Sequence, residues 1–241
     1  MLEADAGGPR RVNPVLRQLL ESGTVDVPDG STQALHSHID RLEGDLLSAW
    51  LAQYAATRVL EIGLAFGVSA LFIADALADR PGATHDIIDP HQARDWHGCG
   101  LRHLERAGYG GRFTFHDEPS ELCLPRLLAR GYRCDAAFID GFHTFDQVLV
   151  DFYYVNRLLE PGGIVVFDDV HMPSVAEVLR HVAAYPCYEP LVLPASFATH
   201  RTVRLRRMMG APPSRIGGFV KAGIDARPWH WHHVGPDGSH V

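Results

Sequence analysis

From residue 58 onward the chain alternates short apolar runs with helical segments, and this alternation constrains the fold more than any other feature. Some of the helical segments end in glycine, which is typical of a helix C-terminus. Largely apolar strands separated by helices imply a parallel sheet that is covered on both faces. The sequence therefore predicts an α/β fold, with five strands at residues 58–62, 85–89, 112–115, 136–140 and 163–169.

The chain is expected to divide into three parts. Residues 1–32 read as a flexible N-terminal lead with a short helix at 14–20. Residues 33–206 read as the main domain, which begins with a cap helix over 33–56. Residues 207–241 are rich in Gly, Pro and His and are expected to form a C-terminal tail or lid. A closing pair of strands is expected at 188–194 and 199–207.

Composition excludes several classes of protein. The 22 basic and 29 acidic residues give a net charge of −7, which argues against a general nucleic-acid binder because phosphate contacts need a basic surface. The four cysteines have no CxxC spacing, so neither a zinc ribbon nor a disulfide framework is expected. No apolar stretch approaches the ~20 residues of a membrane span, and the N-terminus lacks a signal-like run. We expect a cytoplasmic protein with no nucleic-acid or membrane partner.

A glycine-containing turn follows the first strand, with the pattern E-x-G-x-x-x-G over Glu61, Gly63 and Gly67. Glycine lets the backbone turn and approach a ligand without a Cβ collision. The pattern differs from the G-x-G-x-x-G of dinucleotide-binding folds and favours a nucleoside ligand without a pyrophosphate. Asp89 ends the second strand, where a carboxylate can accept hydrogen bonds from a ribose. An ordinary strand–helix turn and a solvated strand end remain the alternatives.

Acidic residues and a histidine follow the fourth and fifth strands. Asp140 ends the fourth strand, His143 comes shortly after it, and Asp168 and Asp169 end the fifth. In a parallel sheet these side chains share one edge with the glycine turn. Converging carboxylates repel one another unless they are protonated or bind a cation, and such oxygen ligands suit Mg²⁺. The alternatives are a helix cap for Asp140, a loop residue for His143 and a solvated turn for the pair.

Three segments, at residues 58–77, 86–90 and 138–170, together resemble the class I S-adenosylmethionine-dependent methyltransferases. More narrowly, they resemble the bacterial small-molecule O-methyltransferases of the macrolide-sugar and novobiocin type and the cephalosporin hydroxylase-like proteins. The resemblance covers roughly residues 35–205. It implies a Rossmann-like fold with a mostly parallel seven-stranded sheet and helices on both faces.

The resemblance also implies the cofactor-binding residues. The residues expected around the methionine moiety are Glu61, Gly63, Gly67 and Ser69, and Asp89 is expected at the ribose. Asp117, Glu118 and Ser120 are expected at the adenine, and Asp140 is also expected to contact the cofactor. Two histidines expected on the cap helix, His36 and His38, and the loop residue Trp96 are further candidates for the pocket wall.

The pattern D-G-x-H followed by D-D resembles the metal-dependent O-methyltransferases. It implies that Asp140, Asp168 and Asp169 bind the metal, and that the catalytic residues are His143, as the base, and Asp140. A divalent cation lowers the pKa of a hydroxyl, and a neighbouring base then removes the proton. Histidine has the intrinsic pKa for that task.

The sequence thus predicts a Mg²⁺-assisted S-adenosylmethionine-dependent O-methyltransferase. Its acceptor would be a small-molecule hydroxyl of the sugar, polyketide or phenol type, as in secondary metabolism, and a homo-oligomer would form through the terminal extensions. Three alternatives stay open: an N-methyltransferase acting on a small molecule, a dinucleotide-binding oxidoreductase, and a catalytically silent binding subunit.

Overall fold

A seven-stranded sheet forms the centre of the protein, for which the computed structural model describes residues 12–231. Residues 1–11 of the expected lead and 232–241 of the expected tail lie outside the described part. The strand order is β5-β4-β3-β6-β7-β9-β8, and β3 to β7 run parallel. β9 is antiparallel to both of its neighbours. The strands are β3 (Arg58–Ile62), β4 (Thr84–Ile88), β5 (Phe113–His116), β6 (Cys134–Ile139), β7 (Leu159–Phe167), β8 (Tyr188–Pro190) and β9 (Gly217–Lys221).

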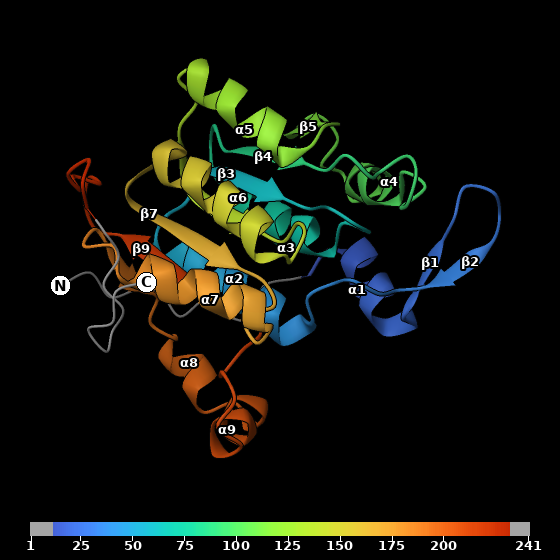
Figure 1. The fold of residues 1–241 in the computed structure, drawn as a ribbon. Helices are drawn as coiled ribbons and strands as arrows, with labels where there is room; N and C mark the ends of the chain where they lie inside the picture. Colours follow the sequence, from blue (N-terminus) through green and yellow to red (C-terminus); the bar gives the residue numbers. More distant parts are fainter. Residues whose placement is uncertain (1–11, 232–241) are drawn as a thin grey trace.

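Helices cover both faces of the sheet (Figure 1). One face packs on α1 to α4, and the other packs on α5 to α7. Successive strand residues alternate between these two cores, with Val59 in one and Leu60 in the other. The predicted α/β fold is therefore confirmed. The helices are α1 (Pro14–Ser22), α2 (Arg41–Gln53), α3 (Val68–Leu77), α4 (Cys99–Arg106), α5 (Ser120–Ala129), α6 (Phe145–Leu158), α7 (Pro173–Ala183), α8 (Ala195–Ala198) and α9 (Arg201–Met208).

The carboxyl ends of the central strands are level with one another. Ile62 pairs with Ile88 on one side and with Ile139 on the other, and Ile139 pairs with Phe167. The backbone ladder continues past the strand ends, since the Asp140 N–H donates to the Ile62 carbonyl at 2.8 Å. The residues that follow β3, β4, β6 and β7 consequently reach the same edge of the sheet.

The cap helix is shorter than the sequence prediction of 33–56. It begins at Arg41, and the preceding residues form a small hairpin of β1 (Thr24–Asp26) and β2 (Thr32–Ala34). Asp40 sets the helix start, because its side chain accepts from the Glu43 N–H while the Glu43 carboxylate accepts from the Asp40 N–H. The two histidines expected on this helix therefore lie in the loop before it.

The predicted closing strand at 199–207 is also wrong. That segment is α9, a helix that contains four arginines and buries only Val203. Arginines at these positions would be costly inside a sheet. The sheet is completed instead by β9, inside the segment that was expected to be a tail from 207. Gly218 permits this pairing, because a Cβ there would lie 2.0 Å from the Val165 carbonyl oxygen.

Within residues 12–231, no helix combines the length and the apolar character that crossing a membrane requires.

Candidate active site

A cavity of about 790 Å³ opens along the carboxyl edge of the sheet. Loops after β3, β4, β6 and β7 line it, together with residues 36–38, 119–121 and Arg215. A smaller cavity of about 390 Å³ lies beside the 78–83 turn, at the amino end of β4 and away from the acidic cluster. The larger cavity thus coincides with the edge at which the sequence predicted both sites.

The turn after β3 requires glycine at its first position. Gly63 has a φ of 92°, and a Cβ there would lie 2.0 Å from the Asp140 carbonyl oxygen. The loop and the end of β6 therefore touch backbone to backbone, and Gly63 lines the cavity. Gly67 caps α3 with a φ of 81° but packs against Gly100 instead of lining the cavity.

Asp89 holds the loops after β3 and β4 together. One oxygen of its carboxylate accepts hydrogen bonds from the N–H groups of Leu64 and Ala65, both at 3.0 Å, and the other accepts from the His91 N–H at 2.6 Å. The residue lines the cavity but is only 3% exposed. Sequence reasoning identified this carboxylate for a ligand and did not foresee that it also shapes the glycine loop.

Glu61 and Ser69 do not reach the cavity wall, contrary to the sequence prediction. Glu61 is fully buried, accepts a 2.6 Å hydrogen bond from the Ser69 hydroxyl and lies 2.8 Å from His85 Nε2. The reason is strand alternation: Glu61 points to the same face as Val59, beneath α3. It anchors α3 to the sheet.

Of the three residues expected at the adenine, only Ser120 lines the cavity. Asp117 is exposed, and Glu118 forms an ion pair with Arg126 on α5. Neither is part of the wall, although the next three residues, 119–121, are. Ser120 donates a 2.6 Å hydrogen bond to Asp151 of α6.

Asp151 is an ionisable group completely buried below the cavity wall. It accepts from Ser120 and, at 3.3 Å, from Gln147, while its second oxygen has no hydrogen-bond partner within residues 12–231. Burial raises the pKa of Asp151 to about 6. The native protein therefore holds this proton more tightly than the unfolded chain does.

We expect the stability cost of Asp151 to depend on pH. Because its folded pKa of about 6 exceeds the unfolded value of about 3.9, its contribution to stability falls as pH rises between these values and stays low above them. Relative to the wild type, Asp151→Asn should gain about 2–3 kcal/mol between pH 4 and pH 7.5. Urea unfolding at both pH values measures this gain. Asp146→Asn, on the exposed face of the same helix, is the control. A stability difference between Asp151→Asn and the wild type that is the same at both pH values would refute the expectation.

Asp140, His143, Asp168 and Asp169 come together at the ends of β6 and β7. One ligand atom each from Asp140, His143 and Asp168 lies within 4.8 Å of the others. His143 Nε2 is 3.6 Å from Asp140 Oδ1 and 3.7 Å from Asp169 Oδ2. The most compact set thus includes His143 in place of Asp169, which has a φ of 48° and directs its other oxygen toward His171, at 3.6 Å.

The electrostatics of this cluster are unfavourable without a cation. Burial, and then the charges of Asp140 and Asp169, raise the pKa of Asp168 to about 9. Burial also raises the pKa of Asp140, and interaction with Asp140 raises the pKa of His143. In the described part of the chain, Asp168 Oδ1 and His143 Nε2 are buried without a hydrogen-bond partner. These unpaired buried atoms and converging carboxylates fit a divalent cation.

Arg215 is a cavity residue that sequence reasoning missed. Its guanidinium donates to the Glu43 carboxylate at 2.9 and 2.7 Å, and Glu43 is fully buried. The D-x-x-E capping box around Glu43 is readable from the sequence, but its partner, 172 residues away, is not. His36, His38 and Trp96 also line the cavity, as the sequence suggested for the pocket wall.

Comparison with known proteins identifies a matching family model and several similar proteins. Residues 60–170 match a family model described as a methyltransferase domain. Over 159 residues the chain is 29% identical to caffeoyl-CoA O-methyltransferase of Petroselinum crispum, a match that covers 59% of this chain and 61% of the relative. A match to an uncharacterised mimivirus protein covers 39% of that relative. The chain thus spans less than two thirds of the curated relatives it matches.

Solved structures show the same fold. An O-methyltransferase from Bacillus cereus in complex with S-adenosylhomocysteine (SAH) superposes with a TM-score of 0.62 at 17% identity, covering 90% of this chain and 94% of the other. A second similar structure is the O-methyltransferase TomG from Streptomyces achromogenes, which is involved in tomaymycin synthesis and was solved with S-adenosylmethionine. It superposes with a TM-score of 0.57 at 23% identity, covering 75% of this chain and 82% of the other. The predicted Rossmann-like methyltransferase fold is confirmed.

Proposed function

Because the chain carries a methyltransferase domain on a Rossmann-like fold, we propose that it is an S-adenosylmethionine-dependent enzyme that methylates a hydroxyl group of a small molecule. One observation carries the proposal. A single cavity is bounded by the glycine loop after β3 and by the cluster of carboxylates and a histidine after β6 and β7. A nucleoside site and a site for activating a hydroxyl therefore share one space.

In this proposal the cofactor lies along the loops after β3 and β4. Gly63 leaves room for the methionine moiety, Asp89 faces the ribose while it holds the loop, and Ser120 borders the adenine. All three residues line the cavity. The sulfonium supplies an electrophilic methyl group. The protein's part is to orient that group toward the acidic cluster and to exclude water from the line of attack.

Asp140 and Asp168, with Asp169 beside them, would hold Mg²⁺. A divalent cation at this position supplies the positive charge that lowers the pKa of an acceptor hydroxyl. His143 then takes the hydroxyl proton on Nε2, and an oxygen lone pair forms the new bond to the methyl carbon. The carbon–sulfur bond breaks, and its electrons stay on sulfur.

The chemistry of the cavity supports a compact acceptor with an apolar body. Phe142 and Met172 line the cavity near the acidic cluster, and the Arg215 guanidinium on the wall is already paired with Glu43. Diphenols of the caffeoyl type, which the name of the plant relative indicates for that enzyme, are therefore the first acceptors to test, followed by sugar and polyketide hydroxyls.

Ligand binding tests the proposal directly. SAH at about 100 times its Kd should stabilise the fold by about 2.7 kcal/mol, which raises the melting temperature by about 5–10 °C in a domain of this size. Differential scanning calorimetry with SAH, and with NAD⁺ in parallel, makes the measurement. A shift with NAD⁺ and none with SAH would remove the proposal in favour of an oxidoreductase.

His143→Ala should lower kcat by about 10²–10⁴-fold, the usual contribution of a general base, and leave SAH affinity within about threefold. Turnover is measured as SAH release with an accepted diphenol. His171→Ala is the matched control, since this half-exposed histidine approaches Asp169 from another direction. If His143→Ala instead abolished Mg²⁺ binding, the residue would be a metal ligand and its role as the base would be refuted.

A further inference from the structure

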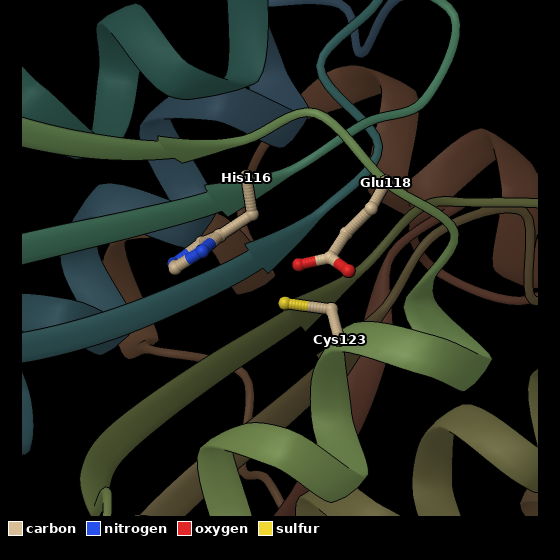
Figure 2. A group of neighbouring side chains, drawn as sticks. All are labelled: His116, Glu118 and Cys123. Carbon is tan, nitrogen blue, oxygen red and sulfur yellow. The ribbon is translucent and has the colours of Figure 1, made fainter.

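A second group of side chains able to bind metal lies outside the cavity. His116 ends β5, Glu118 follows in the loop, and Cys123 is on α5. Figure 2 shows the Glu118 carboxylate and the Cys123 sulfur turned toward each other, with the His116 ring beside them. One ligand atom from each lies within 4.8 Å of the others. We propose that His116, Glu118 and Cys123 bind a Zn²⁺ ion that joins the end of β5 to α5. The inference is independent of the proposed function.

The donor set matches the chemistry of zinc. Imidazole nitrogen, carboxylate oxygen and thiolate sulfur are its three common protein ligands, with bonds of about 2.0–2.3 Å. Two atoms bound to one such ion are no more than about 4.6 Å apart. The ligand atoms of this group are no more than 4.8 Å apart, so small side-chain rotations suffice to bring the three atoms onto one ion.

His116 is already oriented as a zinc ligand would be. Its Nε2 lies 3.0 Å from Asp86 Oδ1, and Asp86 Oδ2 accepts a 3.0 Å hydrogen bond from the Tyr132 hydroxyl. A carboxylate on one ring nitrogen selects the tautomer whose other nitrogen carries the lone pair, which is the usual second shell of a zinc-bound histidine. Nδ1 of His116 would consequently be the nitrogen that binds the ion.

Cys123 is buried, with 1% of its surface exposed, and burial raises its pKa to about 11. Without a cation this thiol is neutral and inert; zinc binding displaces its proton. All four cysteines are buried and free. Within residues 12–231, Cys123 alone among them belongs to a group of metal-binding side chains.

Arg126 competes for one of the ligands. It forms an ion pair with Glu118 from the next turn of α5. A carboxylate has two oxygens, so Glu118 can keep this contact on one and bind the ion through the other. The guanidinium nevertheless lowers the affinity of the site for a cation. Arg126→Gln should therefore bind Zn²⁺ more tightly than the wild type, and weaker binding would exclude Glu118 as a ligand.

The position of the site gives it a structural role. Residues 119–121, which follow Glu118 directly, form part of the cavity wall. An ion bound by His116 and Cys123 would cross-link the strand and the helix on either side of this segment. We therefore expect Zn²⁺ to raise the melting temperature of the full-length protein.

Cobalt titration tests the proposal because Co²⁺ reports on its ligands. The metal-free full chain is titrated with Co²⁺, and the expected result is the near-ultraviolet charge-transfer band of a Co²⁺–thiolate bond, abolished by Zn²⁺. Asp168→Asn should keep this band, because the cluster after β6 and β7 contains no sulfur. Absence of the band in the wild type would overturn the proposal.

Variants of the site complete the test. Cys123→Ser and His116→Asn should lose the band and the stabilisation by Zn²⁺, whereas Cys187→Ser, another buried cysteine, should keep both. Asp86→Asn should lower the affinity for Zn²⁺ about 10–100-fold, the usual effect of losing a carboxylate that hydrogen-bonds a metal-binding histidine. Circular dichroism verifies that each variant is folded. A band that persists in folded Cys123→Ser would refute the site.

Discussion

Asp168→Asn is expected to lower turnover by at least about 10³-fold while SAH affinity stays within a few-fold and the metal-free protein becomes more stable. The loss corresponds to about 4 kcal/mol of transition-state stabilisation, within the several kcal/mol that a catalytic cation supplies. The gain in stability follows from the position of Asp168. It is a buried carboxyl between Asp140 and Asp169 whose pKa is raised to about 9, and a neutral amide of the same shape removes that conflict.

The combination of outcomes distinguishes a functional carboxylate from a structural one. Turnover is measured with and without a chelator, SAH affinity by calorimetry, and stability by thermal unfolding of the chelated protein. Asp95→Asn, an exposed residue paired with Arg94, is the control and should change none of the three. Turnover of Asp168→Asn within tenfold of the wild type, or wild-type turnover that resists chelation, would eliminate the metal from the mechanism.

Gly63→Ala is expected to destabilise the protein by about 3–5 kcal/mol and to abolish SAH binding. Two effects add up at this position. The backbone of residue 63 is left-handed, at φ 92°, and the added Cβ would lie 2.0 Å from the Asp140 carbonyl oxygen. Strain of the first kind costs about 1–3 kcal/mol, and the second forces the backbone of the loop away from β6, at a cost of similar size. The loop that would face the cofactor moves as a consequence.

A second glycine separates the two causes. Gly30 has a φ of 89°, yet a Cβ there would meet no described atom within 4 Å. Gly30→Ala should therefore cost only the backbone strain, about 1–3 kcal/mol, and leave SAH binding unchanged. Urea unfolding and calorimetry on both variants provide the comparison. Equal losses of stability in the two would contradict the close approach of the glycine loop to β6.

The central parallel strands β3, β4, β6 and β7 were predictable because they are largely buried on both faces, which produces a local apolar run. The strands at 58–62 and 136–140 were located to within two residues on this basis. β9 was missed because it begins with Gly217 and Gly218 and has no apolar run; its pairing with β7 depends on close backbone contact. The start of α2 was misplaced because the residues before Asp40 have the same apolar spacing as the helix. The capping box of Asp40 and Glu43 fixes the actual start at Arg41.

Local pattern was thus sufficient for the order of strands and helices from β3 to β7, and it placed Asp140, His143, Asp168 and Asp169 at one edge, because parallel strands end on the same side of a sheet. Only the tertiary structure decided which way each side chain points: Glu61 under α3, Arg215 onto Glu43, and His116, Glu118 and Cys123 toward one another with Asp86 behind. These contacts join side chains from separate elements, several of them far apart in the chain, and their geometry follows from packing, which no local sequence pattern encodes.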